Sequence, residues 1–142
     1  MGSKAILIDS NILIYAINSS SPKQKTAQDF LQKNVGYLVV AHQNVFESLR
    51  VLTHPRFQAP MSSEDAIAAI DAIIERCRII APGYDTLEIA LALVKEHELT
   101  GEKIFDAYLT ATALSAGLST IATDNTKDFL PFREITITNP FK

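Results

Sequence analysis

Short apolar segments that stop at polar residues alternate along the chain with segments of helical periodicity. The first, residues 5–8 (AILI), ends at Asp9 and predicts a buried strand. Further strands are predicted at residues 37–41, 78–81, 119–122 and 134–138. Buried strands that alternate with helices are typical of a parallel sheet with helices on both faces. The pattern therefore predicts an α/β fold with three layers, α/β/α, around a central parallel sheet.

The segments between these strands carry apolar residues at helical spacing. Residues that suit helix N-caps precede several of them, and we place caps at Asn11, Ser21 and Ser63. The clearest loop is residues 55–61, which begins with the proline that ends the preceding helix. The predicted helices are residues 11–17, 21–33, 43–54, 63–77, 86–97 and 104–116.

The chain has 142 residues, which fits one domain over residues 1–142. Its 47% hydrophobic content excludes a disordered chain, and no apolar segment approaches the roughly 20 residues of a membrane span. The single cysteine, Cys77, cannot form an internal disulfide, and no signal-peptide layout is visible, so we expect a cytoplasmic protein. The net charge of −3 argues against non-specific coating of nucleic acid.

Four acidic residues are expected at one edge of the sheet. Asp9 and Asp124 directly follow predicted strands, and chemistry in open α/β sheets lies beyond the carboxyl ends of the strands. Glu47 lies in the first turns of the helix that follows strand 37–41. Asp106 lies in the first turn of helix 104–116, and the four carboxylates converge if the preceding loop brings that turn to the same edge.

Each of these acids also has a purely structural explanation. Asp9 suits an N-cap, and Asp106 interacts favourably with a helix dipole. Glu47 can pair with Arg50, three residues later on the same helix, and Asp124 suits a turn. Taken singly, the structural explanations are the stronger ones. Only the convergence of all four favours a functional site.

Clustered carboxylates repel one another, and a divalent cation removes this conflict. Carboxylates without nearby histidine or cysteine ligands indicate Mg²⁺ or Mn²⁺ rather than zinc. Such a metal polarises phosphoryl oxygens and generates a hydroxide-like nucleophile, so the pattern favours phosphodiester hydrolysis. Without these four ligands, 12 acidic residues stand against 13 basic ones, so the negative charge belongs to the site.

Four segments, in order along the chain, resemble the successive motifs of PIN-domain ribonucleases. They are residues 6–13 (ILIDSNIL), 44–52 (NVFESLRVL), 104–113 (IFDAYLTATA) and 121–129 (IATDNTKDF). Each motif alone is weak, whereas the ordered set is specific and covers nearly the whole chain. The length most resembles the VapC-type toxins of toxin–antitoxin modules.

The resemblance implies a Mg²⁺- or Mn²⁺-dependent endoribonuclease whose products carry 5′-phosphate and 3′-hydroxyl ends. Asp9, Glu47 and Asp106 match the three most regular acidic positions of the family. Asp124 and Asp128 are both candidates for the fourth position, and we favour Asp124.

The resemblance also implies supporting residues and partners. Asn11 matches a polar group beside the first aspartate, and Thr123 matches a hydroxyl that holds an acid or the nucleophilic water. VapC-type relatives dimerise and are inhibited by a cognate antitoxin protein, so we expect an RNA substrate, an antitoxin and a homodimer. Near the predicted edge, Arg50, Arg56 and Lys103 are candidates for RNA contacts. For Arg56 and its neighbour Phe57, a solvated arginine and a core phenylalanine are the slightly stronger explanation.

Three alternative functions are compatible with parts of this pattern. A phosphatase of the haloacid-dehalogenase type needs a second aspartate two residues after the first, where this chain has Asn11. A catalytically silent PIN fold that only binds a partner is disfavoured by acids at all four positions. A housekeeping PIN nuclease in RNA processing stays open.

Overall fold

A computed structural model describes residues 4–142, in which five strands form one sheet of order β3-β2-β1-β4-β5. Every pair of neighbouring strands is parallel. The strands are β1 (Ile6–Ile8), β2 (Leu38–Ala41), β3 (Arg78–Ile80), β4 (Thr120–Ala122) and β5 (Thr136–Thr138). All five predicted strands are present with slightly shorter bounds, which confirms the α/β class.

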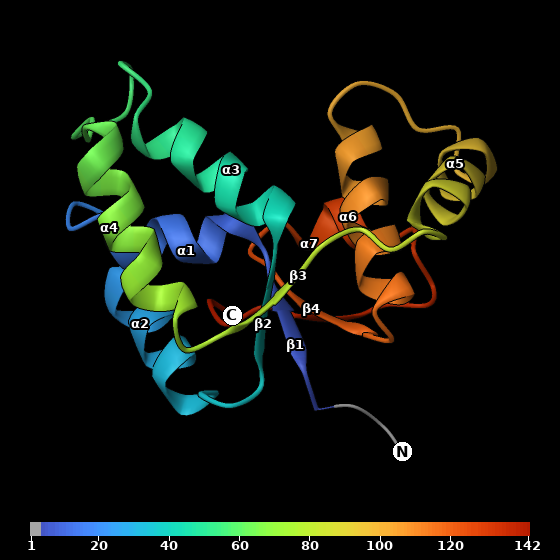
Figure 1. Ribbon diagram of the computed structural model, residues 1–142, viewed down its shortest axis with the longest axis horizontal. Coiled ribbons are helices and arrows are strands. Elements are labelled where there is room, and N and C mark those ends of the chain that lie inside the picture. Colours follow the sequence, from blue (N-terminus) through green and yellow to red (C-terminus); the bar gives the residue numbers. More distant parts are fainter. Residues whose placement is uncertain (1–3) are drawn as a thin grey trace.

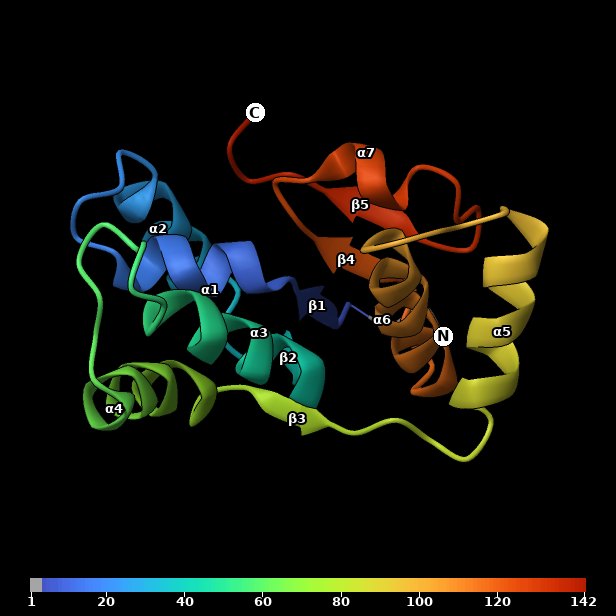
Figure 2. The same cartoon turned by 90° about the horizontal axis from the view of Figure 1, so that it is seen from above.

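Helices cover both faces of this sheet. Figures 1 and 2 show α1–α4 on one side and α5–α7 on the other. The helices are α1 (Ser10–Ile17), α2 (Gln24–Lys33), α3 (His42–Leu52), α4 (Ser63–Ile74), α5 (Thr86–Glu96), α6 (Lys103–Ser115) and α7 (Thr126–Phe129). Within residues 4–142, no helix has the length and apolar content to cross a membrane.

The apolar core is divided by the sheet into two layers. Side chains of successive strand residues point to opposite faces. Leu7 therefore joins the cluster beneath α5 and α6, which contains Leu109, whereas Ile8 joins the cluster beneath α1 and α2, which contains Leu13. All four of these side chains are almost completely buried. The predicted three-layer arrangement is confirmed.

The start of α1 differs from the prediction. Asp9, rather than Asn11, is the N-cap, because the Asp9 carboxylate accepts a hydrogen bond from the Ser10 N–H at 2.8 Å. The structural explanation for Asp9 is thus correct. It does not exclude a functional one, because the cap occupies Oδ1 and leaves Oδ2 for other contacts.

Three other details were not predicted correctly. Helix α2 begins at Gln24 rather than Ser21, because the Ser21 hydroxyl accepts the Lys23 N–H in a turn before the helix. Ser62, not Ser63, caps α4. The short helix α7 was missed altogether, although its last residue, Phe129, is buried in the core.

The parallel arrangement brings three chain connections to one edge of the sheet. Strand β1 leads through Asp9 into α1, β2 leads directly into α3, and β4 leads through residues 123–125 into α7. The first turns of α6 reach the same edge, so that α3 and α6 flank it (Figure 1).

Candidate functional site

A cleft of about 640 Å³ opens at this edge of the sheet, between α3 and α6. It is lined by five acidic residues, of which three were predicted there: Asp9, Glu47 and Asp106. The fourth is Asp128 on α7, and the fifth is Glu102, the exposed residue before α6. The other lining residues are Ser10, Gln43, Phe46, Arg50, Phe105, Leu109 and Asn125.

Asp9 is the most buried of the five acids, with 7% of its surface exposed. Its Oδ1 caps α1, and its Oδ2 accepts hydrogen bonds from the Thr123 hydroxyl at 2.8 Å and the Asn11 amide at 3.3 Å. Burial raises the pKa of Asp9 to about 6, against the effect of the Thr123 hydrogen bond. Both carboxylate oxygens are therefore held in place at the base of the cleft.

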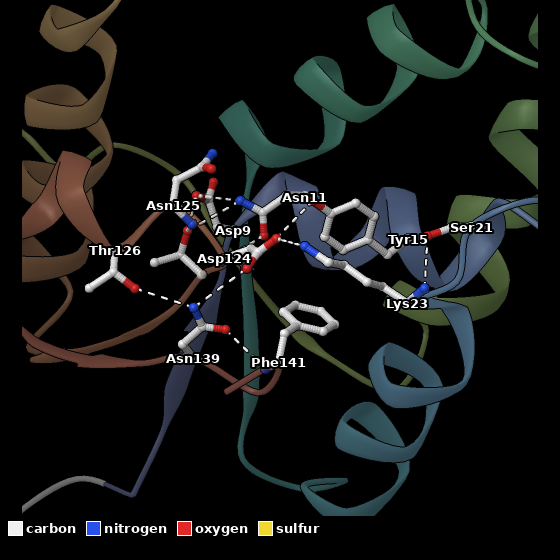
Figure 3. Close-up of polar contacts among 11 residues, drawn as sticks. Asp9, Asn11, Tyr15, Ser21, Lys23, Asp124, Asn125, Thr126, Asn139 and Phe141 are labelled. Carbon is white, nitrogen blue, oxygen red and sulfur yellow. Dashed lines mark hydrogen bonds and ion pairs between the residues drawn. The ribbon is translucent and has the colours of Figure 1, made fainter.

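Thr123 connects β4 to this carboxylate. Its buried hydroxyl donates to Asp9 and accepts hydrogen bonds from the Asn11 amide at 3.2 Å and from the Asn125 N–H at 2.9 Å. Asn11 in turn accepts the Asp124 N–H at 3.2 Å through its Oδ1 (Figure 3). The two predicted supporting residues thus contact Asp9 and tie it to the loop after β4.

Asp106 has the higher pKa of the two shifted acids in the cleft. Burial raises it to about 7, and the charges of Asp128, Asp9, Glu47 and Glu102 add to the shift in that order. These charges raise the pKa because each disfavours a further negative charge in the cleft. A cation bound among the carboxylates would relieve this repulsion.

Gln43 connects the two helices that flank the cleft. Its side-chain amide donates to Glu47 at 3.3 Å on α3 and to the Phe105 carbonyl at 3.1 Å on α6. Sequence reasoning missed this residue, although its spacing of four residues from Glu47 places the two on one helix face. Gln43 therefore restrains both the Glu47 carboxylate and the start of α6.

Asp124 was expected in the cleft, and the structure places its side chain elsewhere. Its Oδ2 accepts hydrogen bonds from Tyr15 at 2.9 Å and Lys23 at 2.5 Å, and its Oδ1 accepts one from Asn139 at 3.5 Å. The Lys23 hydrogen bond holds the pKa of Asp124 below its ordinary value. The acid of this region that lines the cleft is instead Asp128, on α7. The choice of Asp124 over Asp128 is corrected accordingly.

Only one of the three basic candidates for RNA contact lines the cleft. This is Arg50, which is exposed on α3. Arg56, in the loop after α3, and Lys103, at the start of α6, are exposed but do not line the cleft. Phe57 is half-buried against the cluster formed by α3 and α4, so its interpretation as a core residue is confirmed.

Two phenylalanines of the cleft were missed by the sequence analysis. Phe46 is 69% exposed and Phe105 is 58% exposed, and they lie on α3 and α6, respectively. Phe46 precedes Glu47 in the sequence, and Phe105 precedes Asp106. Helical periodicity alone does not reveal that these two rings are exposed. The cleft therefore combines carboxylates with exposed aromatic rings.

The donor set of the cleft suits Mg²⁺ or Mn²⁺, which prefer carboxylate oxygens. Within the described part of the chain, no three Asp, Glu, His or Cys side chains form a ready-made cluster of metal ligands. Mg²⁺ retains several waters and is held through one or two carboxylates, so it needs no complete protein cage. The residues present, Asp9, Glu47, Asp106 and Asp128, fit a hydrated divalent cation on these grounds.

The structure is similar to solved toxin–antitoxin structures. A toxin–antitoxin complex from Klebsiella pneumoniae contains a chain with 23% identity and a TM-score of 0.68, over 97% of this chain and 99% of that one. VapBC2 from Rickettsia felis, bound to a promoter DNA fragment, gives 16% identity and a TM-score of 0.73, over 95% and 98%. VapC20 from Mycobacterium tuberculosis, a toxin that cleaves the sarcin–ricin loop, gives 15% and 0.65, over 82% and 87%.

These identities establish a shared fold. A comparison with curated protein sequences finds no significant match. The family model of the PIN domain matches residues 6–135, which include all four motifs that suggested the resemblance. The chain belongs to the PIN domain family.

Proposed function

We propose that this chain is a divalent-metal-dependent endoribonuclease and the VapC-type toxin of a toxin–antitoxin pair. The observation that carries the proposal is the cleft in which Asp9, Glu47, Asp106 and Asp128 meet, with the pKa of Asp9 and of Asp106 raised. Perturbed carboxylates in a cleft are characteristic of catalytic and metal sites.

Asp9, Glu47, Asp106 and Asp128 would hold Mg²⁺ or Mn²⁺. When bound, the metal supplies Lewis acidity toward the phosphoryl oxygens and a hydroxide-like nucleophile. Thr123 and Asn11 orient the Asp9 carboxylate, and Gln43 orients Glu47.

RNA is the proposed substrate because the cleft offers contacts for both phosphates and bases. Arg50 is positioned to contact a phosphate, and the exposed rings of Phe46 and Phe105 to stack on unpaired bases. These contacts suit a single-stranded loop or bulge of a structured RNA. One toxin with the same fold, VapC20 from Mycobacterium tuberculosis, cleaves the sarcin–ricin loop.

A cognate antitoxin is proposed as the protein partner, because the similar structures from Klebsiella pneumoniae and Rickettsia felis are toxin–antitoxin assemblies. An apolar groove of about 260 Å³ between α2 and α4, lined in part by Leu31, Val35 and Ile73, offers it a binding surface. A homodimer is proposed as well, and the exposed Leu87 and Leu91 of α5 offer an apolar contact for it. A short adjacent gene for a DNA-binding protein that copurifies with this chain would support the toxin role; its absence would favour a housekeeping nuclease.

The catalytic proposal is tested by incubating the protein with structured RNA and Mg²⁺ or Mn²⁺. Cleavage should stop in excess EDTA and in the Asp9→Asn variant, whose circular dichroism spectrum should stay that of the wild type. Asp71→Asn, at an exposed position of α4, is the matched control and should cleave normally. Full cleavage by Asp9→Asn or in EDTA would refute the mechanism. An inert wild-type protein that binds a partner tightly would favour a silent binding module.

A further inference from the structure

The Asp124 side chain belongs to a polar and aromatic cluster beside the loop that follows β4 (Figure 3). Its other members are Tyr15, Lys23, Asn139 and Phe141, which together with Asp124 are called the Lys23–Asp124 cluster below. The Lys23 ammonium lies 5.1 Å from the ring centroid of Tyr15 and 5.4 Å from that of Phe141. The two rings meet edge to face with centroids 5.2 Å apart.

The cluster joins three parts of the chain that are distant in sequence. Tyr15 comes from α1, Lys23 from the turn before α2, and Asn139 and Phe141 from the segment after β5. Tyr15, Lys23 and Asn139 each donate a hydrogen bond to the Asp124 carboxylate, whose side chain is only 12% exposed. Phe141 contacts the Tyr15 ring and the Lys23 ammonium. Asn139 also donates to Thr126 at 3.3 Å, in the first turn of α7. The cluster therefore restrains the segment between β4 and α7 at Asp124, and the start of α7 at Thr126.

The backbone of the same segment holds the catalytic carboxylate. The Asp124 N–H donates to Asn11, and the Asn125 N–H donates to Thr123, so both groups that contact Asp9 Oδ2 receive a hydrogen bond from this segment. Asp124 therefore connects the cluster to Asp9. Its side chain belongs to the cluster, and its backbone N–H holds Asn11, which contacts Asp9.

We propose that Lys23 and Asp124 form a positioning pair, which fixes the segment of residues 123–125 so that Thr123 and Asn11 hold Asp9 in its metal-binding orientation. The role as a positioning pair for metal binding rests on the proposed function. Stability alone is a weak explanation, because ion pairs with an exposed partner contribute little and the Lys23 side chain is 42% exposed. The aromatic rings add a reason for a cation at position 23, since they stabilise its charge from two sides.

The first experiment measures amide hydrogen exchange in the metal-free protein, without RNA. In Lys23→Met, the Asp124 and Asn125 N–H groups should exchange about tenfold faster, as expected for the loss of one charge-assisted hydrogen bond. The amides of the core strands β1 and β2 should be unaffected. Lys25→Met is the matched control, because Lys25 is an exposed residue of α2 whose one ion pair within residues 4–142 is with Asp29 on the helix surface. Unchanged exchange at both amides in Lys23→Met would overturn the proposal, whatever the protein cleaves.

The second experiment measures Mn²⁺ binding by calorimetry for the single variants and their combination. Lys23→Met and Asp124→Leu should each weaken Mn²⁺ binding by about tenfold, the lower end of the range for outer partners of metal ligands. The double variant should not bind Mn²⁺ more weakly than either single variant, because the effects of two substitutions in residues that act as a unit do not add. Lys23→Arg should restore binding.

Two results of the second experiment would overturn the proposal. One is wild-type Mn²⁺ affinity in Lys23→Met. The other is complete loss of binding in Asp124→Leu with normal binding in Lys23→Met, which would make Asp124 a ligand itself. If the wild-type protein binds no Mn²⁺, the proposed function fails, and the hydrogen-exchange result still decides whether the pair fixes the segment.

Discussion

Asp106 and Asp128 face the same cleft from α6 and α7, and after burial the charge of Asp128 is the largest influence that raises the pKa of Asp106 to about 7. The two acids are 22 positions apart in the chain but close in the folded protein. The two carboxylates repel each other in the folded protein, and a cation bound near them would be stabilised by both charges.

The first prediction concerns pH and the metal-free protein. The pKa of Asp9 is about 6 and that of Asp106 about 7, both above the ordinary value of 3.8, so the folded state binds protons more tightly than the unfolded state. The resulting stability is fully present below pH 4 and is lost as pH rises through 6 and 7. The free energy of unfolding measured with urea in EDTA should therefore fall from pH 5 to pH 8, by about 1.4 kcal/mol from Asp9 alone, because pH 5 lies about one unit below its pKa.

The variant Asp106→Asn provides the control for this pH dependence. Without the Asp106 carboxyl, the decrease in stability between pH 6 and pH 8 should become smaller. A wild-type midpoint that rises over the same range would contradict the raised pKa values.

The second prediction is that Asp128→Asn separates stability from function. Loss of the Asp128 charge should lower the pKa of both Asp106 and Asp9, so the metal-free variant should melt at a higher temperature than the wild type at pH 8. If Asp128 holds the metal as proposed, the Mn²⁺ affinity of the variant should fall by more than the roughly 10–100-fold typical of residues that only contact a ligand. Calorimetry with and without Mn²⁺ measures both effects. A lower melting temperature in EDTA would show that Asp128 does not repel the other acids.

Most of the fold, and three of the four acids proposed to hold the metal, could be predicted because local sequence determines them. The strand at residues 5–8 is marked by its apolar run, and Asp9 follows it directly, so topology alone brings Asp9 to the carboxyl edge. Glu47 and Asp106 lie in the first turns of helices, where the regular helix geometry sets the direction of each side chain.

The fourth acid could not be predicted in the same way. Asp124 and Asp128 lie in or next to an irregular segment, where the direction of a side chain depends on contacts distant in sequence. Lys23, about one hundred residues earlier in the chain, draws Asp124 away from the cleft, and the burial of Phe129 helps to form the short helix that carries Asp128. No local pattern contains this information.

The third prediction concerns the aromatic wall of the cleft. Phe105→Ala should raise the KM for RNA with little change in kcat, because a ring that stacks on a base contributes about 1–3 kcal/mol to binding. The ring is 58% exposed, so its loss should leave thermal stability nearly unchanged. Leu130→Ala, another exposed apolar residue outside the cleft, is the control. Cleavage kinetics on a structured RNA measure the effect, and an unchanged KM would remove Phe105 from the substrate site.

The last prediction tests the hydroxyl that holds Asp9. Thr123→Val keeps the shape of the side chain but removes the hydrogen bond to Asp9 and the acceptor for Asn11 and Asn125, at a cost of about 1–3 kcal/mol in the free energy of unfolding. Because the Thr123 hydrogen bond lowers the pKa of Asp9, its loss should raise that pKa further in the metal-free protein, and a titration of the Asp9 carboxyl by NMR in EDTA measures the change. Thr123→Ser keeps the hydroxyl and should preserve the wild-type pKa. If Thr123→Val lost stability but left the pKa of Asp9 unchanged, the hydroxyl would hold the fold without tuning the carboxylate.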